Sequence, residues 1–118
     1  MLKTRAAITA VGAYLPETIL DNKTLETMVD TNDEWIVTRT GIKERRILKE
    51  PNKATAFMAT KAAENLLHKS GLDPKEIDLI IVATATPDMP VVATAAQVIT
   101  AIGATNAFGY DLEAACSG

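Results

Sequence analysis

The stretch LIIVA, residues 79–83, is an apolar run with no polar residue inside it. Such a run predicts a strand covered on both faces, as in a parallel sheet with helices above and below it. Before it, apolar residues at helical spacing predict a helix that begins around residues 52–55 and ends at Gly71. After it, residues 95–102 predict a second helix and residues 107–112 a further strand. Strands alternating with helices favour an α/β fold with a largely parallel sheet.

The first fifty residues predict shorter elements. Residues 6–13 are apolar and rich in alanine, and they predict a buried first strand. Residues 21–22 are helix N-cap types, and the apolar residues after them predict a short helix. Residues 31–32 can begin another short helix, which Gly41 would end. The charged stretch 42–48 predicts an exposed strand or an extended loop.

Composition excludes several classes of protein. The chain has 118 residues, of which 47% are hydrophobic and 23% charged, and this argues against disorder. A net charge of −3 argues against a nucleic-acid partner, and no segment approaches the ~20 apolar residues of a membrane span. One cysteine and one histidine give neither an internal disulfide nor a zinc pattern, so we expect no metal and a reduced, cytoplasmic protein. The mixed charges of residues 43–46 predict a solvated edge, or a surface that meets an acidic partner.

Cys116 is the strongest candidate for a reactive group. It lies just past the predicted strand 107–112, among small residues, and ligands of open α/β sheets bind beyond the carboxyl ends of strands. A helix beginning at this point would favour the thiolate. The alternative is that a lone cysteine is a small buried hydrophobic residue. His68 is a poor candidate for its base, because the last turn of a predicted helix gives imidazole a structural role.

Trp35 and Arg39 are the second candidate pair. They lie four residues apart on a predicted helix and therefore share one face. An indole beside a guanidinium can stack on a heterocycle and hold a phosphate, and Thr31 adds a hydroxyl at the start of the helix. The alternative is that Trp35 anchors a core while Arg39 pairs with Glu34 or Asp33.

Four stretches together resemble one known family. They are VGAYLP at 11–16, DNKTLETMVDTNDEWIVTRTGIKERR at 21–46, IDLIIVATATPD at 77–88 and YDLEAACSG at 110–118. They are similar to β-ketoacyl-acyl-carrier-protein synthase III, the enzyme that initiates bacterial type II fatty-acid synthesis. The similarity runs along the whole chain.

The resemblance implies a fold, a reaction and a site. The fold would be the layered α/β fold of the thiolase type, and the complete enzyme would be a homodimer. Cys116 matches the nucleophile that takes an acyl group from acyl-CoA, and Thr31, Trp35 and Arg39 match residues that bind CoA. The acyl group would then be joined to malonyl-acyl-carrier-protein with loss of carbon dioxide. Acyl-CoA would be a substrate, so no separate cofactor is expected.

The acyl pocket departs from the family pattern. Relatives commonly carry a Phe-Pro pair where this chain has Val91 and Val92. Since a valine at position 91 leaves more room than a phenylalanine, a primer larger than acetyl, or a branched one, is a hypothesis for this chain.

The resemblance also implies that residues 1–118 are a partial N-terminal thiolase-like domain that ends just after the nucleophile. The family's catalytic His and Asn have no counterpart here, so we expect this polypeptide alone to be inactive in condensation. The alternative is a non-catalytic module for dimerisation and CoA docking, with the chemistry in another chain.

Overall fold

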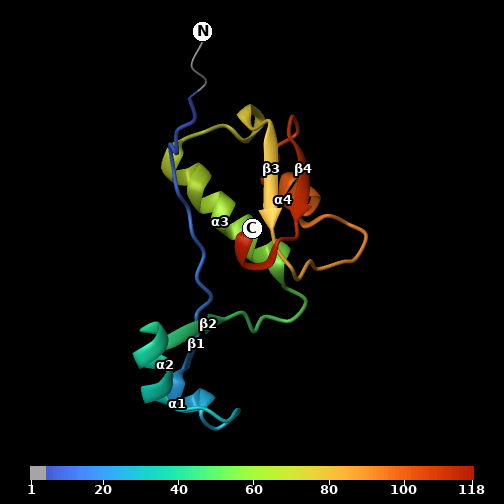
Figure 1. Cartoon of the computed structure of the whole chain (residues 1–118). Coiled ribbons are helices and arrows are strands. Elements are labelled where there is room, and N and C mark those ends of the chain that lie inside the picture. Colours follow the sequence, from blue (N-terminus) through green and yellow to red (C-terminus); the bar gives the residue numbers. More distant parts are fainter. Residues whose placement is uncertain (1–4) are drawn as a thin grey trace. The chain divides into compact units, whose positions relative to one another are not determined.

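The computed structural model describes residues 5–118, which form two compact units (Figure 1). One comprises the described residues up to Tyr14 together with Lys53–Gly118, and the other is Leu15–Asn52. The elements of the first unit are α3 (Thr55–Ser70), η1 (Pro74–Glu76), β3 (Leu79–Ala83), α4 (Thr94–Ile102), β4 (Phe108–Leu112) and η2 (Ala115–Ser117). Those of the second are β1 (Thr18–Asp21), α1 (Asn22–Leu25), α2 (Asp33–Thr40) and β2 (Glu44–Ile47). The single partial domain over residues 1–118 stays a prediction.

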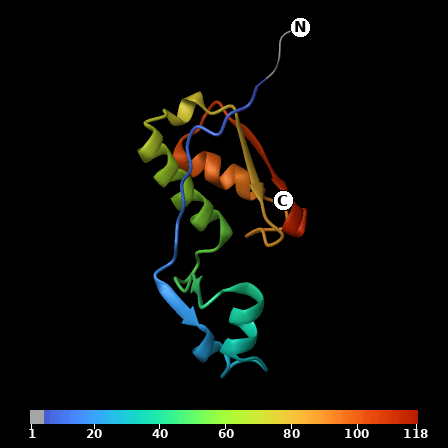
Figure 2. The same ribbon diagram turned by 60° about the vertical axis from the view of Figure 1, so that its left-hand side comes forward.

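A parallel pair of strands organises the first unit. β3 and β4 pair in register from Leu79 opposite Phe108 to Ala83 opposite Leu112, and α4 connects them. The helix α4 lies against one face of this pair and α3 packs on α4 (Figure 2). The strands predicted over residues 79–83 and 107–112, their parallel arrangement and the two helices predicted beside them are therefore confirmed.

Within residues 5–118, the opposite face of β3 and β4 has no helix on it. Both helices lie on the same side, so inward side chains such as Ile80 and Val82 are partly covered while their neighbours alternate outward. The exposed apolar side chains of the outer face are those of Leu79, Ile81, Phe108, Tyr110 and Leu112. The expected cover on both faces is thus found on one face only within the described residues.

The core of the first unit is built from small side chains. Ala95 and Val98 of α4 are almost fully buried, as is Ala104 just after the helix. Both long helices end at a glycine in the left-handed conformation, Gly71 and Gly103, whose N–H closes the last turn. Small core residues let the backbones of neighbouring elements approach closely. The packing therefore depends on these positions having small side chains or none.

Gly109 of β4 is one such close approach. A Cβ at this position would lie 2.7 Å from the carbonyl oxygen of Ile80 and 2.9 Å from Cδ1 of Ile99. We expect Gly109→Ala to lower the free energy of unfolding by about 1–3 kcal/mol, because a strand backbone cannot yield as a side chain does. Urea unfolding of the intact protein measures the change. Thr100→Ala at an exposed site of α4 should stay within about 0.5 kcal/mol, and equal effects of the two substitutions would contradict the explanation.

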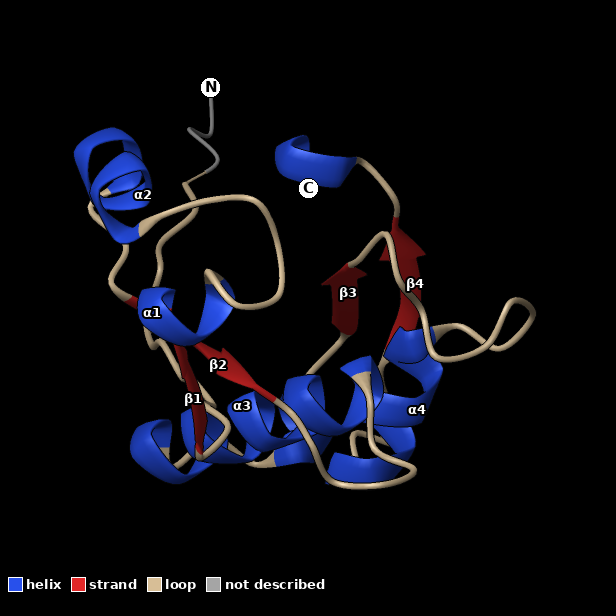
Figure 3. Cartoon of the chain, turned by 90° about the horizontal axis from the view of Figure 1, so that it is seen from below, coloured by secondary structure: helices blue, strands red, loops and turns tan. Residues whose placement is uncertain are grey.

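The second unit is an antiparallel strand pair with two short helices, whose strands are drawn in red in Figure 3. β1 and β2 pair from Thr18 opposite Ile47 to Asp21 opposite Glu44. The Asp21 carboxylate caps α1, and the Asn32 side chain caps α2. Gly41 ends α2 in the left-handed conformation. The helix ends predicted from residues 21–22, 31–32 and 41 are confirmed, and β2 confirms the extended stretch.

The strand predicted over residues 6–13 is wrong. The segment runs extended along α3, with the Ala13 N–H donating to Oδ1 of Asn65 at 3.2 Å. A Cβ on Gly12 would lie 2.5 Å from the carbonyl oxygen of Ala62, so this glycine lets the segment lie close to the helix. A strand needs a partner for its N–H and C=O groups, and among residues 5–118 this segment has none.

Candidate active site

Cys116 is exposed in a short turn beyond the carboxyl end of β4. The ladder continues past the strands, because the Thr84 N–H donates to the Leu112 carbonyl at 3.1 Å. The turn folds back onto the end of β3, where a Cβ on Gly118 would lie 3.1 Å from the Cβ of Ala83. Cys116 therefore lies where open parallel sheets bind their ligands, as predicted, and the alternative of a buried cysteine does not hold for the described residues.

The backbone before Cys116 has an unusual conformation. Ala115 has a φ of 46°, a left-handed value that an alanine rarely adopts. The turn is closed by a hydrogen bond from the Ser117 N–H to the Ala114 carbonyl at 2.9 Å. Such conformations cost on the order of 1–3 kcal/mol and cluster at functional sites. The turn presents the thiol to solvent at that cost.

Val91 lines a hollow of about 320 Å³ beside the same ends of the strands. Its side chain is 95% exposed. The rest of the lining comes from the loop between β3 and α4 and from the end of β4, namely Thr84, Pro87, Met89, Pro90, Val92, Ala93, Asp111 and Glu113. Cys116 does not line this hollow, so the structure places the two predicted residues at one end of the sheet without joining them in one cavity.

Asp111 fixes that loop to the sheet, and the sequence did not reveal it. Its carboxylate accepts the backbone N–H groups of Thr94 and Ala95 at 2.6 and 2.8 Å, so a residue of β4 caps α4. Burial of the carboxylate acts to raise its pKa, but the hydrogen bonds from Ala95 and Thr94 outweigh burial and hold the pKa below its ordinary value of 3.8. The signal in the sequence was a carboxyl at an inward position of an apolar strand, because a carboxyl placed there needs hydrogen-bond partners.

Trp35 and Arg39 form the second group of candidate residues. The guanidinium carbon of Arg39 lies 4.5 Å from the centroid of the Trp35 ring, so the cation stacks on the indole. Trp35 is 51% exposed, which is not the burial of a core anchor. Thr31 and Trp35 share a hollow of about 270 Å³ with Asp30 and Asn32. The structure brings these three predicted residues together on one short helix and the turn before it.

The arginines of the 43–46 run are engaged inside the second unit. Arg45 donates to Oδ1 of Asn22 at 2.8 Å and to the Leu20 carbonyl at 3.2 Å. Arg46 donates to the Pro16 carbonyl at 3.3 Å and lies 3.6 Å from the Glu44 carboxylate. The predicted solvated edge fits the exposed Glu44 and Arg46, whereas Arg45 is only half-exposed and is bonded within the second unit.

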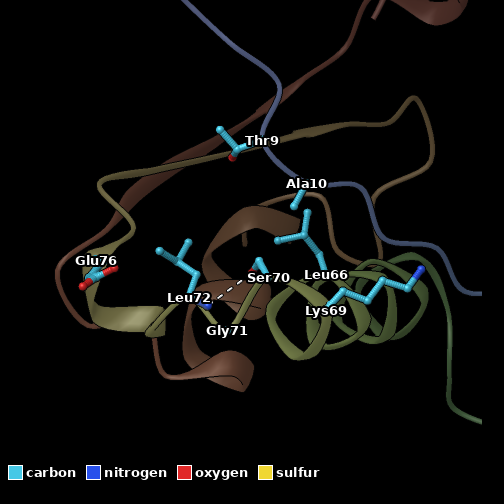
Figure 4. A pocket seen from close by; sticks show the side chains of 8 residues that line it. All are labelled: Thr9, Ala10, Leu66, Lys69, Ser70, Gly71, Leu72 and Glu76. Atoms are coloured by element: carbon cyan, nitrogen blue, oxygen red, sulfur yellow. Dashed lines mark hydrogen bonds between the residues drawn. The ribbon is translucent and has the colours of Figure 1, made fainter.

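A further hollow of about 580 Å³ lies between the N-terminal segment and the end of α3 (Figure 4). Its lining is Thr9, Ala10, Leu66, Lys69, Ser70, Gly71, Leu72 and Glu76. Inside it the Leu72 N–H donates to Oγ of Ser70 at 3.2 Å. No sequence-predicted site residue lines it. His68 lies nearby in the last turn of α3, the position predicted for a structural histidine.

Among residues 5–118, no three His, Cys, Asp or Glu side chains gather closely enough to hold a metal ion. None of the helices in the same range has the length and apolar character needed to cross a membrane.

This chain is similar to several curated proteins named β-ketoacyl-[acyl-carrier-protein] synthase III. The chain is 60% identical over 114 residues to the β-ketoacyl-[acyl-carrier-protein] synthase III of Chlorobaculum tepidum. This match covers 97% of this chain and 35% of that protein. It is 53% identical over 116 residues to the synthase III of Porphyromonas gingivalis W83, covering 98% of this chain and 35% of that protein. The chain thus spans about a third of the length of these relatives. No family model matches it.

Solved structures give the same result for the fold. The 3-oxoacyl-[acyl-carrier-protein] synthase III of Aquifex aeolicus VF5 matches with a TM-score of 0.84 and 49% identity over 92% of this chain and 35% of its own. The synthase III of Thermus thermophilus matches with a TM-score of 0.82 and 48% identity, over 92% of this chain and 33% of its own. In sequence and in its thiolase-type α/β fold, the chain matches the N-terminal part of β-ketoacyl-[acyl-carrier-protein] synthase III.

Proposed function

We propose that the chain supplies the nucleophile and the CoA-binding surface of a condensing enzyme. The Cys116 thiolate attacks the carbonyl carbon of acyl-CoA, the C–S bond to CoA breaks, and CoA leaves as its thiolate. Malonyl-acyl-carrier-protein then loses carbon dioxide to give an enolate, whose carbon attacks the acyl-cysteine and releases Cys116. Covalent capture divides one difficult bond formation into two easier steps.

The observation that carries this proposal is the exposed thiol of Cys116 at the carboxyl ends of two parallel strands. A nucleophile at that edge can be approached from outside the sheet, and the left-handed Ala115 directs the turn there. The names of the relatives support the reaction class, since they are synthases that act on an acyl carrier protein.

The nucleotide end of CoA would bind at α2. Adenine can stack on the exposed indole of Trp35, and the guanidinium of Arg39 offers its donors to phosphate oxygens. The Thr31 hydroxyl lies at the same hollow and can bond the sugar or base. These roles rest on the side chains present on one face and on the resemblance of this helix to the CoA-binding residues of the family.

The acyl group would extend toward the hollow that Val91 lines. Since valine leaves this space wider than a phenylalanine would, we infer that a primer longer than acetyl, or branched, is accommodated. We also propose that the partner in condensation is an acyl carrier protein. The complete enzyme would be a homodimer located in the cytoplasm.

Acyl transfer to the chain tests the proposed function. Incubation with acetyl-CoA at neutral pH should add one acetyl group, located by peptide mass spectrometry on Cys116. Trp35→Ala should slow this transfer at low acetyl-CoA by about tenfold or more, since stacking of a base on an aromatic ring is worth ~1–3 kcal/mol. Trp35→Phe, which keeps a ring, is the matched control and should lose less. CoA binding with an inert Cys116 would favour the non-catalytic docking module instead.

A further inference from the structure

Asn22 is a buried amide whose hydrogen-bonding groups are almost all used. Only 1% of the surface of Asn22 is exposed to solvent. The side-chain nitrogen donates to Oδ1 of Asp33 at 2.7 Å and to the carbonyl of Ile42 at 2.8 Å. The side-chain oxygen accepts from Nη2 of Arg45 at 2.8 Å. A buried polar group with three partners of this quality fixes the elements that it joins.

The two acceptors of Asn22 lie at opposite ends of α2. Asp33 is the first residue of the helix, and Ile42 follows its C-cap, Gly41. One carboxamide therefore holds both ends of the helix that carries Trp35 and Arg39. This tether matters because Ile36 is the one residue that α2 buries, so apolar packing alone holds the helix weakly.

Asn22 is in turn fixed to the strand pair. Its backbone N–H donates to the Lys43 carbonyl at 3.1 Å, where β1 and β2 end. The Arg45 guanidinium that bonds its side chain also bonds the Leu20 carbonyl at 3.2 Å. The chain of contacts thus leads from the strands through Asn22 to both ends of α2, all inside one compact unit.

We propose that Asn22 is a positioning residue for CoA recognition, because its carboxamide sets the orientation of α2 and so of the Trp35–Arg39 stack. The inference rests on the proposed binding of CoA at this helix. The site requires two donors and one acceptor on one short planar group, which asparagine provides. An aspartate has the same shape but no donor, and it would place a carboxylate against Asp33.

Fluorescence of Trp35, the chain's one tryptophan, tests the inference. Stacked adenine should quench it, so titration with CoA gives a dissociation constant. Asn22→Asp is expected to raise that dissociation constant by about tenfold or more, because the substitution removes the hydrogen bond to the charged Asp33. The loss of one hydrogen bond to a charged group corresponds to a factor of about this size. Asp21→Ala is the matched control, because it removes the cap of α1 in the same unit without a contact to α2, and it should stay within about twofold.

A rescue variant separates positioning from general damage to the fold. In N22D/D33N the carboxylate and the amide exchange places, so the bond between positions 22 and 33 can form again with its direction reversed. The double variant should bind CoA more tightly than Asn22→Asp alone, and the near-ultraviolet circular dichroism of Trp35 without ligand should return toward the wild type. An equal loss in both variants, or an unchanged dissociation constant for Asn22→Asp, would overturn the inference.

Failure of the proposed function gives a different result. If CoA does not quench Trp35 in the wild-type chain, the CoA proposal falls, whereas the ligand-free spectra still test whether Asn22 orients α2. Altered Trp35 spectra in Asn22→Asp but not in Asp21→Ala would support the positioning role. Identical spectra in the two variants would remove it.

Discussion

Replacing Cys116 by serine is expected to reduce condensation by at least about 10³-fold, because removal of a covalent nucleophile leaves only binding and electrostatic effects. A cysteine thiol provides some thiolate at neutral pH, whereas a serine hydroxyl provides essentially none without a base. Release of carbon dioxide from malonyl-acyl-carrier-protein in the presence of acyl-CoA measures the rate. Since the condensing reaction is proposed for the complete enzyme, the intact protein is the material to use.

Ser117→Ala is the matched control for this substitution. Ser117 neighbours Cys116 in the same turn, and its backbone N–H, which closes the turn on Ala114, is kept when the hydroxyl is removed. We expect this variant to keep its rate within about twofold, because the thiol and the backbone hydrogen bond that closes the turn are both retained. CoA binding should be unchanged in both variants, because α2 belongs to the other compact unit. A serine variant that condenses within tenfold of the wild type would show that the sulfur is not the nucleophile.

Local sequence signals predicted most of the helices and strands. Asn32 and Gly41 mark the two ends of α2, and Gly103 ends α4, because caps and left-handed glycines act within one helical turn. The shared face of Trp35 and Arg39 followed from a spacing of four residues, and the stack at 4.5 Å confirms that they meet.

Contacts between distant parts of the chain could not be read from local patterns. Residues 6–13 have the composition of a strand, but composition does not show whether a partner strand is within reach. Asn22 resembles a helix cap in sequence, yet its side chain bonds Asp33 and Ile42, 11 and 20 residues away. The parallel pairing of β3 with β4 was predictable, while the capping of α4 by a residue of β4 required the register of that pair.

Asp111→Ala is expected to lower the free energy of unfolding by about 2–4 kcal/mol, more than any other substitution considered for this unit. The carboxylate accepts two N–H groups at the start of α4, those of Thr94 and Ala95, and both residues are 0% exposed. Without it, these donors are buried and unpaired. Asp111→Asn keeps one good acceptor and should lose less. Urea unfolding of the intact protein measures both effects. Glu113→Gln is the control, because it removes a negative charge from an exposed side chain two residues after Asp111.

The stabilisation by the Asp111 carboxylate depends on pH with a defined sign, which Asp111→Asn tests. The hydrogen bonds from Ala95 and Thr94 hold the pKa of Asp111 below its ordinary value of 3.8, so the folded protein keeps the carboxylate ionised where the unfolded chain begins to protonate. The stabilisation is therefore fully present above that ordinary pKa and is lost as the pH falls through the lower folded-state pKa. The stability difference between wild type and Asp111→Asn should be constant near neutral pH and shrink in acid. A difference that stays constant into acid, or that grows, would mean that the α4 N–H groups do not depend on the charge of this carboxylate. Because Asp111 also lines the hollow beside Val91, a loosened α4 should in addition alter acyl-chain preference in the condensation assay.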